Sequence, residues 1–328
     1  MRHNRATVGR LRIGLSGAGA MGSMHARVLG RLADRCELAG VFDVDPERSR
    51  ALAAQCGVPA YAAFESLLSR VDAVVVAAST VAHAEQVLAC VAAGRHVLVE
   101  KPAAPDLAAT RALREAVGRP PVVVQVGHIE HFNPTVATLR RVLGGVPPVV
   151  VSGRRLGPPT SRGDGLDVIT DLMLHDIHVL VSLGPGALVG ADAVALGAGA
   201  SDYAHATLRF EGGTVADLTA SRITGTRLRV LEATTADAHV TADYVRGTVH
   251  IASWREAGEL VEHAPVGTDE PLERELLAFV QAIRHGTPPE VGLDAAVRCM
   301  EVVDAIRRSA QVHVAGLEPP AAAAGWSA

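Results

Sequence analysis

A glycine-rich segment near the start of the chain constrains the fold more than any other feature of the sequence. It reads GAGAMG from Gly17 to Gly22, directly after the apolar run Leu11–Ser16 and at the start of a helical pattern over about residues 21–32. In such a strand, turn and helix, Gly17 permits a tight turn, Gly19 lets the backbone approach a pyrophosphate, and Gly22 lets the helix pack closely on the strand. The helix N-terminus then faces the phosphate charge. The segment therefore predicts a dinucleotide site.

Short apolar runs and helical patterns alternate through residue 126. After Leu11–Ser16 the runs are Leu38–Phe42, Ala73–Ala77, His96–Val99 and Val122–Val126. Unbroken apolar runs of this kind are typical of parallel strands that helices cover on both faces. Asp45 and Pro46 are placed to begin one of the helices, as N-cap and first helical residue. We therefore predict an α/β domain with a doubly wound parallel sheet over residues 1–126.

The pattern changes after residue 126. We expect a helix from Asn133 and Pro134, a Gly/Pro/Ser loop over Gly157–Gly165 and a helix over Asp167–Leu183. Alternating strands with glycine turns follow, over Tyr203–Phe210, Thr214–Ala220, Arg227–Ala233, His239–Tyr244 and Thr248–Ser253. Two amphipathic helices come last, over about residues 271–284 and 293–309. This predicts an α+β domain with a large, mostly antiparallel sheet over residues 127–317, whose final helices can pack back on the first domain, and a loose tail over 318–328.

The composition excludes several classes of protein. The 328 residues carry 31 Lys and Arg against 35 Asp and Glu, a net charge of -4, with 3% aromatic residues, so we expect no nucleic-acid partner. Charged side chains interrupt the longest apolar stretch, Val71–Val99, whereas a membrane helix needs about 20 nearly uncharged residues. The four cysteines are scattered and no signal-peptide pattern is present. We therefore expect a cytoplasmic protein with no membrane partner and no disulfide framework.

An acidic residue stands where the ribose of a dinucleotide would lie. Asp43 follows the run that ends at Phe42, about 20 positions after Gly22. Its carboxylate can accept hydrogen bonds from both hydroxyls of an adenosine ribose, and it would repel a 2′-phosphate. The position favours NAD over NADP, although Arg48 nearby leaves NADP open. A turn or cap role is the alternative for Asp43, but Asp45 is the better cap candidate.

A lysine stands at the end of a later predicted strand. The sequence HVLVEKP places Glu100, Lys101 and Pro102 there. Pro102 ends the strand and stiffens the backbone, so Lys101 is presented at the carboxyl edge of the sheet, where doubly wound folds bind ligands. A loop lysine taken alone is usually just solvated.

Several longer segments resemble one known family over nearly the whole chain. GAGAMG, HAEQVLACVAAGRHVLVEKP and EPLERELLAFVQAIRHGTPPEVGLDAAVRCMEVVDAIRRSA are similar to the Gfo/Idh/MocA family, named for glucose-fructose oxidoreductase and inositol dehydrogenase. The segments VGHIEHFNPTV, RRLGPP, DLMLHDIH and ADLTASRI resemble its nucleotide-sugar 3-dehydrogenase branch. The resemblance implies a dehydrogenase with a nicotinamide cofactor.

The family pattern also implies which residues carry the chemistry. Asp171 and His175, in DLMLHDIH, are four positions apart and so share one side of a helix. Without the family, such a pair is more often a surface pair or a packed pair. The resemblance places a lysine, an aspartate and a histidine around the reacting hydroxyl and the nicotinamide, which carries over onto Lys101, Asp171 and His175.

The same resemblance extends to binding residues. We expect the cofactor to contact Gly17, Gly19, Ala20, Met21, Gly22, Asp43, Ser79, Thr80, His83, Glu100, Lys101 and Asn133. We expect the substrate to contact Lys101, His131, Arg154, Arg155, Asp171, His175 and Arg222. The three arginines are equally well explained as exposed salt-bridge residues.

Two histidines depart from the family pattern. Relatives commonly have Arg where this chain has His131, and Asp where it has His178. Since His cannot grip a phosphate bidentately, His131 puts a nucleotide-linked substrate in doubt. His178 could tune His175 or simply pack. The two His-x-x-His pairs lack accompanying cysteines, and hydride transfer needs no metal, so we expect no metal site.

These observations predict an NAD-dependent dehydrogenase that oxidises a secondary hydroxyl, at C3, of an amino or acetamido sugar. The sugar is nucleotide-linked or part of a glycoside such as an aminoglycoside intermediate, and an aminotransferase would use the ketone. A homodimer or homotetramer formed through the second domain is expected. The alternative is a non-catalytic, NAD-dependent regulator of the same fold, against which the retained Lys101, Asp171 and His175 argue.

Overall fold

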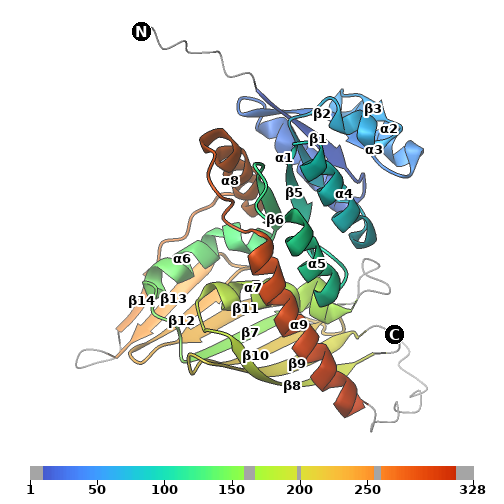
Figure 1. Cartoon of the computed structure of the whole chain (residues 1–328). Coiled ribbons are helices and arrows are strands. Elements are labelled where there is room, and N and C mark those ends of the chain that lie inside the picture. Colours follow the sequence, from blue (N-terminus) through green and yellow to red (C-terminus); the bar gives the residue numbers. More distant parts are fainter. Residues whose placement is uncertain (1–9, 159–166, 198–200, 255–259, 315–328) are drawn as a thin grey trace, which may run out of the picture. The chain divides into compact units, whose positions relative to one another are not determined.

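The protein is described by a computed structural model over residues 10–158, 167–197, 201–254 and 260–314. The chain divides into two compact units (Figure 1). The first contains residues up to Ala137 and Gly267–Met300, and the second contains Thr138–Val266 and residues from Glu301 onward. The expected boundary lay at residue 126. In the structure the first unit also contains α8 (Pro271–His285), one of the final helices expected to pack back on it, and α8 packs there against α1 (Ala20–Arg31).

The first unit is built on a six-stranded parallel sheet, as predicted. Its strands are ordered β3-β2-β1-β4-β5-β6. Their bounds are β1 Leu11–Ser16, β2 Cys36–Phe42, β3 Ala60–Tyr61, β4 Ala73–Val76, β5 His96–Glu100 and β6 Val124–Gly127. The order reverses between β1 and β4, and ligands of doubly wound folds bind outside the carboxyl ends of the strands at such a point.

Helices of the first unit begin and end near the capping residues that the sequence predicts. Their bounds are α1 Ala20–Arg31, α2 Pro46–Cys56, α3 Phe64–Leu68, α4 Thr80–Ala92, α5 Leu107–Val117, the short η1 Ile129–Phe132 and α8 Pro271–His285. Asp45 caps α2 by accepting from the main-chain N–H groups of Glu47 and Arg48, and Gly57 ends that helix in the left-handed conformation, at φ 68°. Local sequence signals therefore set these boundaries.

The second unit is built on an eight-stranded sheet. Its order is β14-β13-β12-β11-β7-β10-β9-β8, and all neighbours are antiparallel except β7 and β10. The bounds are β7 Val150–Leu156, β8 Leu188–Leu196, β9 Tyr203–Phe210, β10 Val215–Ser221, β11 Leu228–Thr234, β12 Ala238–Asp243, β13 Thr248–Ser253 and β14 Leu260–Ala264. This confirms the predicted large, mostly antiparallel sheet.

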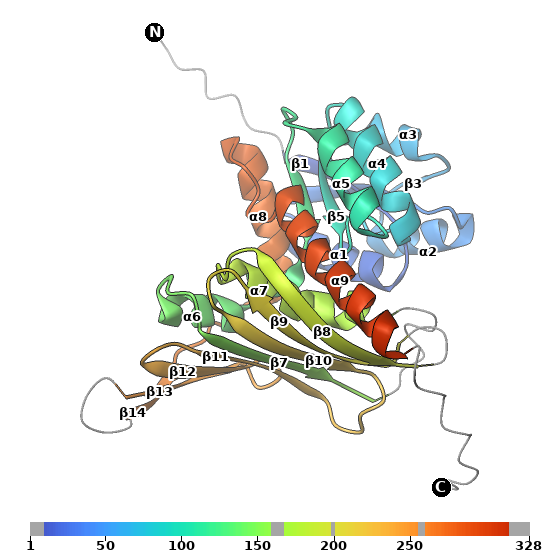
Figure 2. The same ribbon diagram turned by 60° about the horizontal axis from the view of Figure 1, so that its bottom comes forward.

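Helices cover only one face of this sheet among the residues that the structure describes (Figure 2). A π-helical turn, η2 (Ile169–Met173), runs into α7 (Leu174–Ser182) on that face. η2 contacts β10 and α7 contacts β7. Two helices cross the division between the units, α6 (Pro134–Leu143) and α9 (Leu293–Val314). The sheet thus has one packed face and one open face.

Some elements were missing from the sequence interpretation. β7, with two arginines and a glycine, and β8, with the sequence LVGADAVAL, lack a clear alternation of polar and apolar residues. The short β3 and α3 and the strand β14 were also not predicted. Most of the loop expected over Gly157–Gly165 and the tail over 318–328 lie outside the described residues. Among the described helices, none is both long and apolar enough to span a bilayer.

Candidate active site

The glycine segment forms the turn between β1 and α1 in the first unit. Gly17 has a φ of 101°, and a Cβ there would lie 2.4 Å from the main-chain oxygen of Ala77. A Cβ on Gly22 would lie 1.9 Å from the main-chain oxygen of Gly17, so only glycine fits. A Cβ on Gly19 would meet no atom within 4 Å, so open space adjoins that backbone. Each glycine therefore has the geometry that its predicted role requires.

The carboxylate of Asp43 accepts hydrogen bonds from the backbone of this turn and from that of the residue before α2. Its Oδ2 atom accepts from the main-chain N–H of Ala18 at 2.6 Å, and its Oδ1 atom accepts from that of Asp45 at 2.8 Å. Each carboxylate oxygen accepts more than one hydrogen bond, so capacity for a ribose hydroxyl remains. Ala20 and Met21 form the first turn of α1, whose cap residue Gly19 brings no side-chain acceptor to its N–H groups. The loop is thus open to an anion.

Three predicted cofactor residues lie at the start of α4, next to the turn. Ser79 is the cap residue of this helix and Thr80 is its first residue. His83 is buried, with Nδ1 at 2.8 Å from the main-chain oxygen of Pro102 and Nε2 at 3.0 Å from that of Ala78. His83 therefore links α4 to the segment after β5, and its direct contact with the cofactor stays a prediction.

Lys101 follows the last residue of β5, at the carboxyl edge where it was predicted. The peptide bond between Lys101 and Pro102 is cis. Glu100 is buried, and its Oε2 atom accepts from the main-chain N–H of Lys101 at 3.2 Å. The Glu100 carboxylate is thus directed at protein groups, and it holds the backbone from which the Lys101 side chain extends.

The segment after β6 adds histidines near this lysine. The pKa of His128 is lowered to about 3, mainly by burial and in part by the charges of Lys101 and His131. His131, in η1, has its Nε2 atom 3.3 Å from Glu290 Oε2. Asn133 caps α6, since its Oδ1 atom accepts from the main-chain N–H of Thr135 at 2.9 Å. These placements leave the ligand contacts of His131 and Asn133 as predictions.

In the second unit, a buried ion pair joins α7 to the sheet. Arg155 of β7 donates to Asp176 of α7 through Nε at 3.0 Å and Nη2 at 2.8 Å, and both side chains are at most 5% exposed. The guanidinium also lies 5.6 Å above the ring of Tyr244. Arg155 was predicted to bind substrate; its placement shows that it joins α7 to the sheet, and its contact with substrate stays a prediction.

Asp171 and Arg222, both predicted substrate residues, meet on the helix-covered side. Arg222 follows β10 and its Nη2 atom lies 3.4 Å from Asp171 Oδ2, in η2. His175 lies in the first turn of α7 and is half-buried, whereas His178 is buried one turn later. The burial of His178 favours the packing role over a ligand contact.

Arg154 lies on the opposite face of the sheet. Side chains alternate along β7, so Arg155 points to the helices and Arg154 points to the open face, where its Nη2 atom lies 3.7 Å from Glu232 Oε2. Arg154 therefore cannot share a site with Asp171 on α7's side of the sheet. This corrects its prediction as a substrate anchor.

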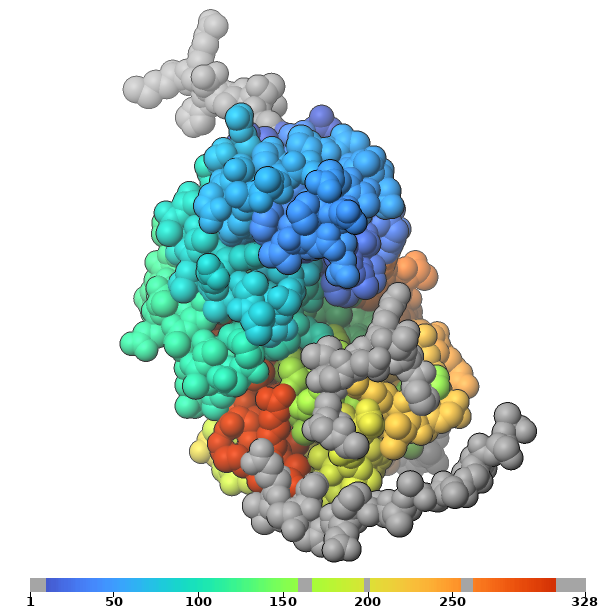
Figure 3. All heavy atoms as spheres, turned by 90° about the vertical axis from the view of Figure 1, so that its right-hand side faces the viewer, coloured from blue at the N-terminus to red at the C-terminus, as the bar shows by residue number. Residues whose placement is uncertain are grey.

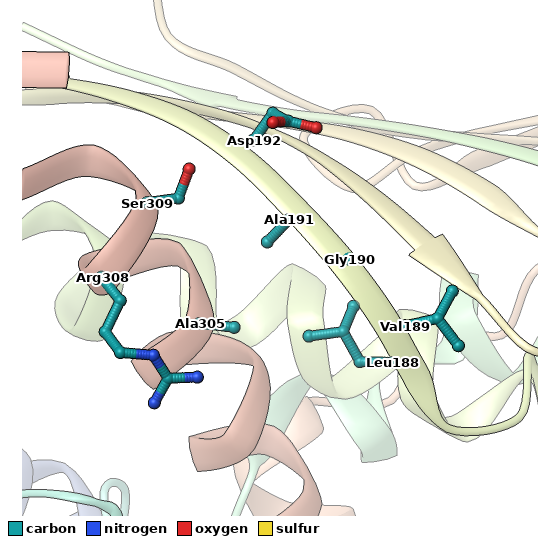
Figure 4. Close-up of a pocket in the computed structure, with 8 residues that line it drawn as sticks. All are labelled: Leu188, Val189, Gly190, Ala191, Asp192, Ala305, Arg308 and Ser309. Carbon is teal, nitrogen blue, oxygen red and sulfur yellow. The ribbon is translucent and has the colours of Figure 1, made fainter. Parts of the chain in front are cut away.

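Two cavities lie away from the predicted residues. One, of about 520 Å³, lies between β8 and α9 in the second unit and is lined by Leu188, Val189, Gly190, Ala191, Asp192, Ala305, Arg308 and Ser309 (Figure 4). The end of α9, in red, reaches the surface beside the yellow-green strands of this unit (Figure 3). Ser309 Oγ accepts from the main-chain N–H of Ala193 at 2.9 Å and so holds α9 to the edge strand.

The other cavity, of about 510 Å³, lies in the first unit beside His96 and Val124, where β5 and β6 begin. The glycine turn is at the carboxyl ends of the strands, so this cavity is at the opposite edge of the sheet. Neither cavity coincides with the dinucleotide site.

Comparison with known proteins decides the family. An oxidoreductase family described by its NAD-binding Rossmann fold, the Gfo/Idh/MocA family, matches residues 11–128. UDP-N-acetylglucosamine 3-dehydrogenase from Acidithiobacillus ferrooxidans is 33% identical over 243 residues, which are 74% of this chain and 76% of that protein. The chain belongs to the Gfo/Idh/MocA family.

Solved structures and a further sequence relative agree with this assignment. A structure of the Acidithiobacillus ferrooxidans dehydrogenase has a TM-score of 0.87 and 30% identity, covering 92% of this chain and 98% of that one. Myo-inositol 2-dehydrogenase from Thermotoga maritima is 28% identical over 86% of this chain and 90% of that protein. Levoglucosan dehydrogenase, solved with NADH and levoglucosan, has a TM-score of 0.83 at 19% identity, which shows the shared fold.

The first unit of this Gfo/Idh/MocA oxidoreductase is its NAD-binding Rossmann domain. The open space beside Gly19 and the uncapped start of α1 fit a pyrophosphate, and the Asp43 carboxylate fits a ribose diol. The sequence interpretation missed His25, which pairs with Glu100 in the first unit, and the buried Glu275 near that pair. It also missed Asp176, which joins α7 to the sheet of the second unit through Arg155. Asp176 stands beside His175 in DLMLHDIH, but its partner lies 21 positions away, so the pair needed the fold to be found.

Proposed function

We propose that this oxidoreductase oxidises a secondary hydroxyl, at C3, of an amino or acetamido sugar to the ketone with NAD as acceptor. The observation that carries the proposal is the 33% identity with a UDP-N-acetylglucosamine 3-dehydrogenase over 74% of this chain. The segment with Lys101 lies within the resemblance to the family, and the segment with Asp171 and His175 lies within the resemblance to that branch. A sugar substrate also agrees with the inositol dehydrogenases among the relatives.

Each assigned residue has one task. A bound NAD⁺ would supply the acceptor for the hydride of the carbinol carbon. His175 accepts the hydroxyl proton, and the Lys101 ammonium donates a hydrogen bond to the developing alkoxide. Asp171, whose Oδ2 atom lies 3.4 Å from Arg222 Nη2, orients His175 or a neighbouring sugar hydroxyl. Arg222 is thereby the arginine best placed to contact the substrate.

The substrate is a nucleotide-linked sugar or a glycoside such as an aminoglycoside intermediate. His131 bears on this choice, because an arginine there could bind a phosphate bidentately and a histidine cannot. A 3-keto product is a substrate for an aminotransferase, so we propose that such an enzyme uses it next.

The experiment is a substrate panel. NAD is supplied with UDP-N-acetylglucosamine, free amino sugars, aminoglycosides and myo-inositol, and NADH absorbance is followed. Oxidation should rise with pH through one ionisation, because His175 accepts a proton only when neutral. His175→Asn should retain NAD binding and lower turnover by roughly 10² to 10⁴-fold, the usual share of a general base. NAD binding without turnover of any sugar would favour the non-catalytic regulator instead.

The open face of the eight-stranded sheet is proposed as the contact of a homodimer or homotetramer. Val150 and Val215 are paired across β7 and β10, and their exposed fractions are 43% and 37%. Exposed apolar side chains on an uncovered sheet favour association with a second copy. Light scattering should give a mass of two or four chains, and a monomer at working concentration would refute this part.

A further inference from the structure

A buried group of polar side chains lies at the end of β5 in the first unit. His25 of α1, Glu100 of β5 and Glu275 of α8 each offer one nitrogen or oxygen atom, and these atoms lie within 4.8 Å of one another. The exposed fractions of the three residues are 0%, 7% and 0%. Burying charged groups at this depth is costly unless they are paired or neutralised. Their protonation states are therefore part of the structure.

Glu100 is well supplied with donors. Its Oε1 atom lies 2.7 Å from His25 Nε2, and its Oε2 atom accepts from the main-chain N–H of Lys101 at 3.2 Å. A Cβ on Gly127 of β6 would lie 3.2 Å from that Oε2 atom, so the glycine leaves just enough room for the carboxylate. An acceptor with a donor on each oxygen can carry a negative charge.

Glu275 has the opposite surroundings. No residue that the structure describes donates a hydrogen bond to either carboxylate oxygen. Burial raises the pKa of Glu275 well above its usual range, and the charge of Glu100 raises it further. Its polar neighbour Gln125, on β6, donates at 3.3 Å to the main-chain oxygen of Glu275 and not to its side chain. A neutral carboxylic acid suits this position, whereas a carboxylate does not.

Other charged groups around α1 and α8 are engaged elsewhere. Arg31 of α1 pairs with Glu270 and Glu273 towards the surface. The short helix η1 also packs against α8, and its Glu130 accepts from Asn133. The titratable groups that the structure brings together at Glu275 are thus His25 and Glu100.

We propose that the two buried carboxyl groups hold different charges in the working protein, Glu275 as a neutral acid and Glu100 as a carboxylate held by His25, and that Glu100 thereby positions Lys101. The last part rests on the proposed function, in which Lys101 stabilises the alkoxide. Because Glu275 is neutral, it does not repel the negative charge of Glu100, which lies between α1 and β5. His25 and Glu100 are positioning residues, since they act through the backbone of Lys101.

A divalent cation among the same three residues is the competing interpretation. Two ligands of a tetrahedral Zn²⁺ ion with bonds of about 2.0–2.1 Å lie about 3.3 Å apart. His25 Nε2 and Glu100 Oε1 are 2.7 Å apart, which is the distance of a hydrogen bond and too short for two such ligands. A proton between these groups fits the geometry without any movement.

The charge assignment is tested by Glu275→Gln, which has the shape of a protonated glutamate. As pH rises above the usual glutamate range, the unfolded state releases this proton while the folded state keeps it, so the stability of the wild type falls relative to the variant. The Tm of Glu275→Gln minus the Tm of the wild type should therefore increase from pH 5 to pH 8. The matched control is Glu273→Gln, on the same helix, whose half-buried carboxylate pairs with Arg31 at 3.0 Å; it should show no such gain.

Two results would overturn the assignment. One is a Glu275→Gln variant that is less stable than the wild type at pH 8 by at least as much as at pH 5. The other is a stoichiometric divalent metal in the purified wild type, measured by elemental analysis, that is lost from Glu275→Gln. Neither measurement uses a sugar, so both are independent of the proposed function.

The positioning role is tested by Glu100→Gln, assayed with NAD and UDP-N-acetylglucosamine. If Glu100 holds Lys101 for the reaction, kcat should fall roughly tenfold or more while KM changes less than about threefold. A kcat equal to that of the wild type would refute the role. If Glu100→Gln does not fold, His25→Gln removes the imidazole and should give the same split. Wild-type inactivity on the whole sugar panel would count against the proposed function and leave the charge assignment standing.

Discussion

The dinucleotide turn of the first unit and the helix α7 of the second unit are held in place by different kinds of interaction. The turn is held by backbone geometry, since a Cβ on Gly17 or Gly22 would overlap main-chain atoms. The helix is held by side chains, through the buried pair of Arg155 with Asp176. Backbone requirements are local and leave a fixed spacing in the sequence, whereas side-chain partners can be far apart in it. The two regions should therefore fail differently when single residues are changed.

The largest effect is expected at Gly22. In Gly22→Ala the new Cβ would lie 1.9 Å from the main-chain oxygen of Gly17, and a backbone atom cannot rotate away. The turn must then open, and NAD binding measured by calorimetry should fall below detection. The control is Gly30→Ala in the same helix, where a Cβ meets no atom within 4 Å. That variant should bind NAD normally and gain about 0.5–1 kcal/mol of stability. Equal NAD affinity in both variants would break the comparison.

The buried pair of the second unit gives the next effect. Asp176→Asn keeps the shape of the side chain but leaves the Arg155 guanidinium buried without its counter-charge, which costs about 3–5 kcal/mol. Denaturant unfolding should show this loss. Arg154→Gln removes the neighbouring but half-exposed arginine from its 3.7 Å contact with Glu232 and should cost only about 0–1 kcal/mol. Similar losses of unfolding free energy in the two variants would mean that burial does not determine how much each ion pair contributes to stability.

The same contrast explains how much of the molecule was predictable. The parallel strands of the first unit other than β3, and the turn at Gly17, follow from periodicity and glycine spacing. β7 could not be predicted, because its inward Arg155 is tolerated only by the pairing with Asp176. For the same reason, nothing in the sequence separated Arg154 from Arg155, although one lies on each face of the sheet. Asp171 and Arg222 were both identified as site residues, but their contact spans 51 positions and required the fold.

A moderate effect is expected at Asp43, whose side chain accepts a hydrogen bond from the backbone of the turn. Asp43→Ser removes the acceptors for the main-chain N–H groups of Ala18 and Asp45 and the carboxylate that would bind the ribose. Hydrogen bonds to a charged group contribute about 1.5–3 kcal/mol, so NAD affinity should fall about tenfold or more. The preference for NAD over NADP should narrow as well, because the repulsion of a 2′-phosphate is lost. Steady-state kinetics with both cofactors would measure it. A wild type that uses NADP as efficiently as NAD would show that Asp43 is not the determinant.

The smallest effect is expected at Asp45, two residues further on, and it separates stability from cofactor binding. The Asp45 side chain accepts from the main-chain N–H groups of Glu47 and Arg48 at the start of α2, and losing a cap of this kind costs about 0.5–2 kcal/mol. The hydrogen bond between residues 43 and 45 uses the main-chain N–H of Asp45 and not its side chain, so alanine retains it. Asp45→Ala should therefore lower the free energy of unfolding by about 1 kcal/mol and leave the NAD dissociation constant unchanged within about twofold. If NAD affinity instead fell as far as in Asp43→Ser, the geometry of the turn would depend on several side chains. The turn would then be held by side chains, as α7 is in the second unit.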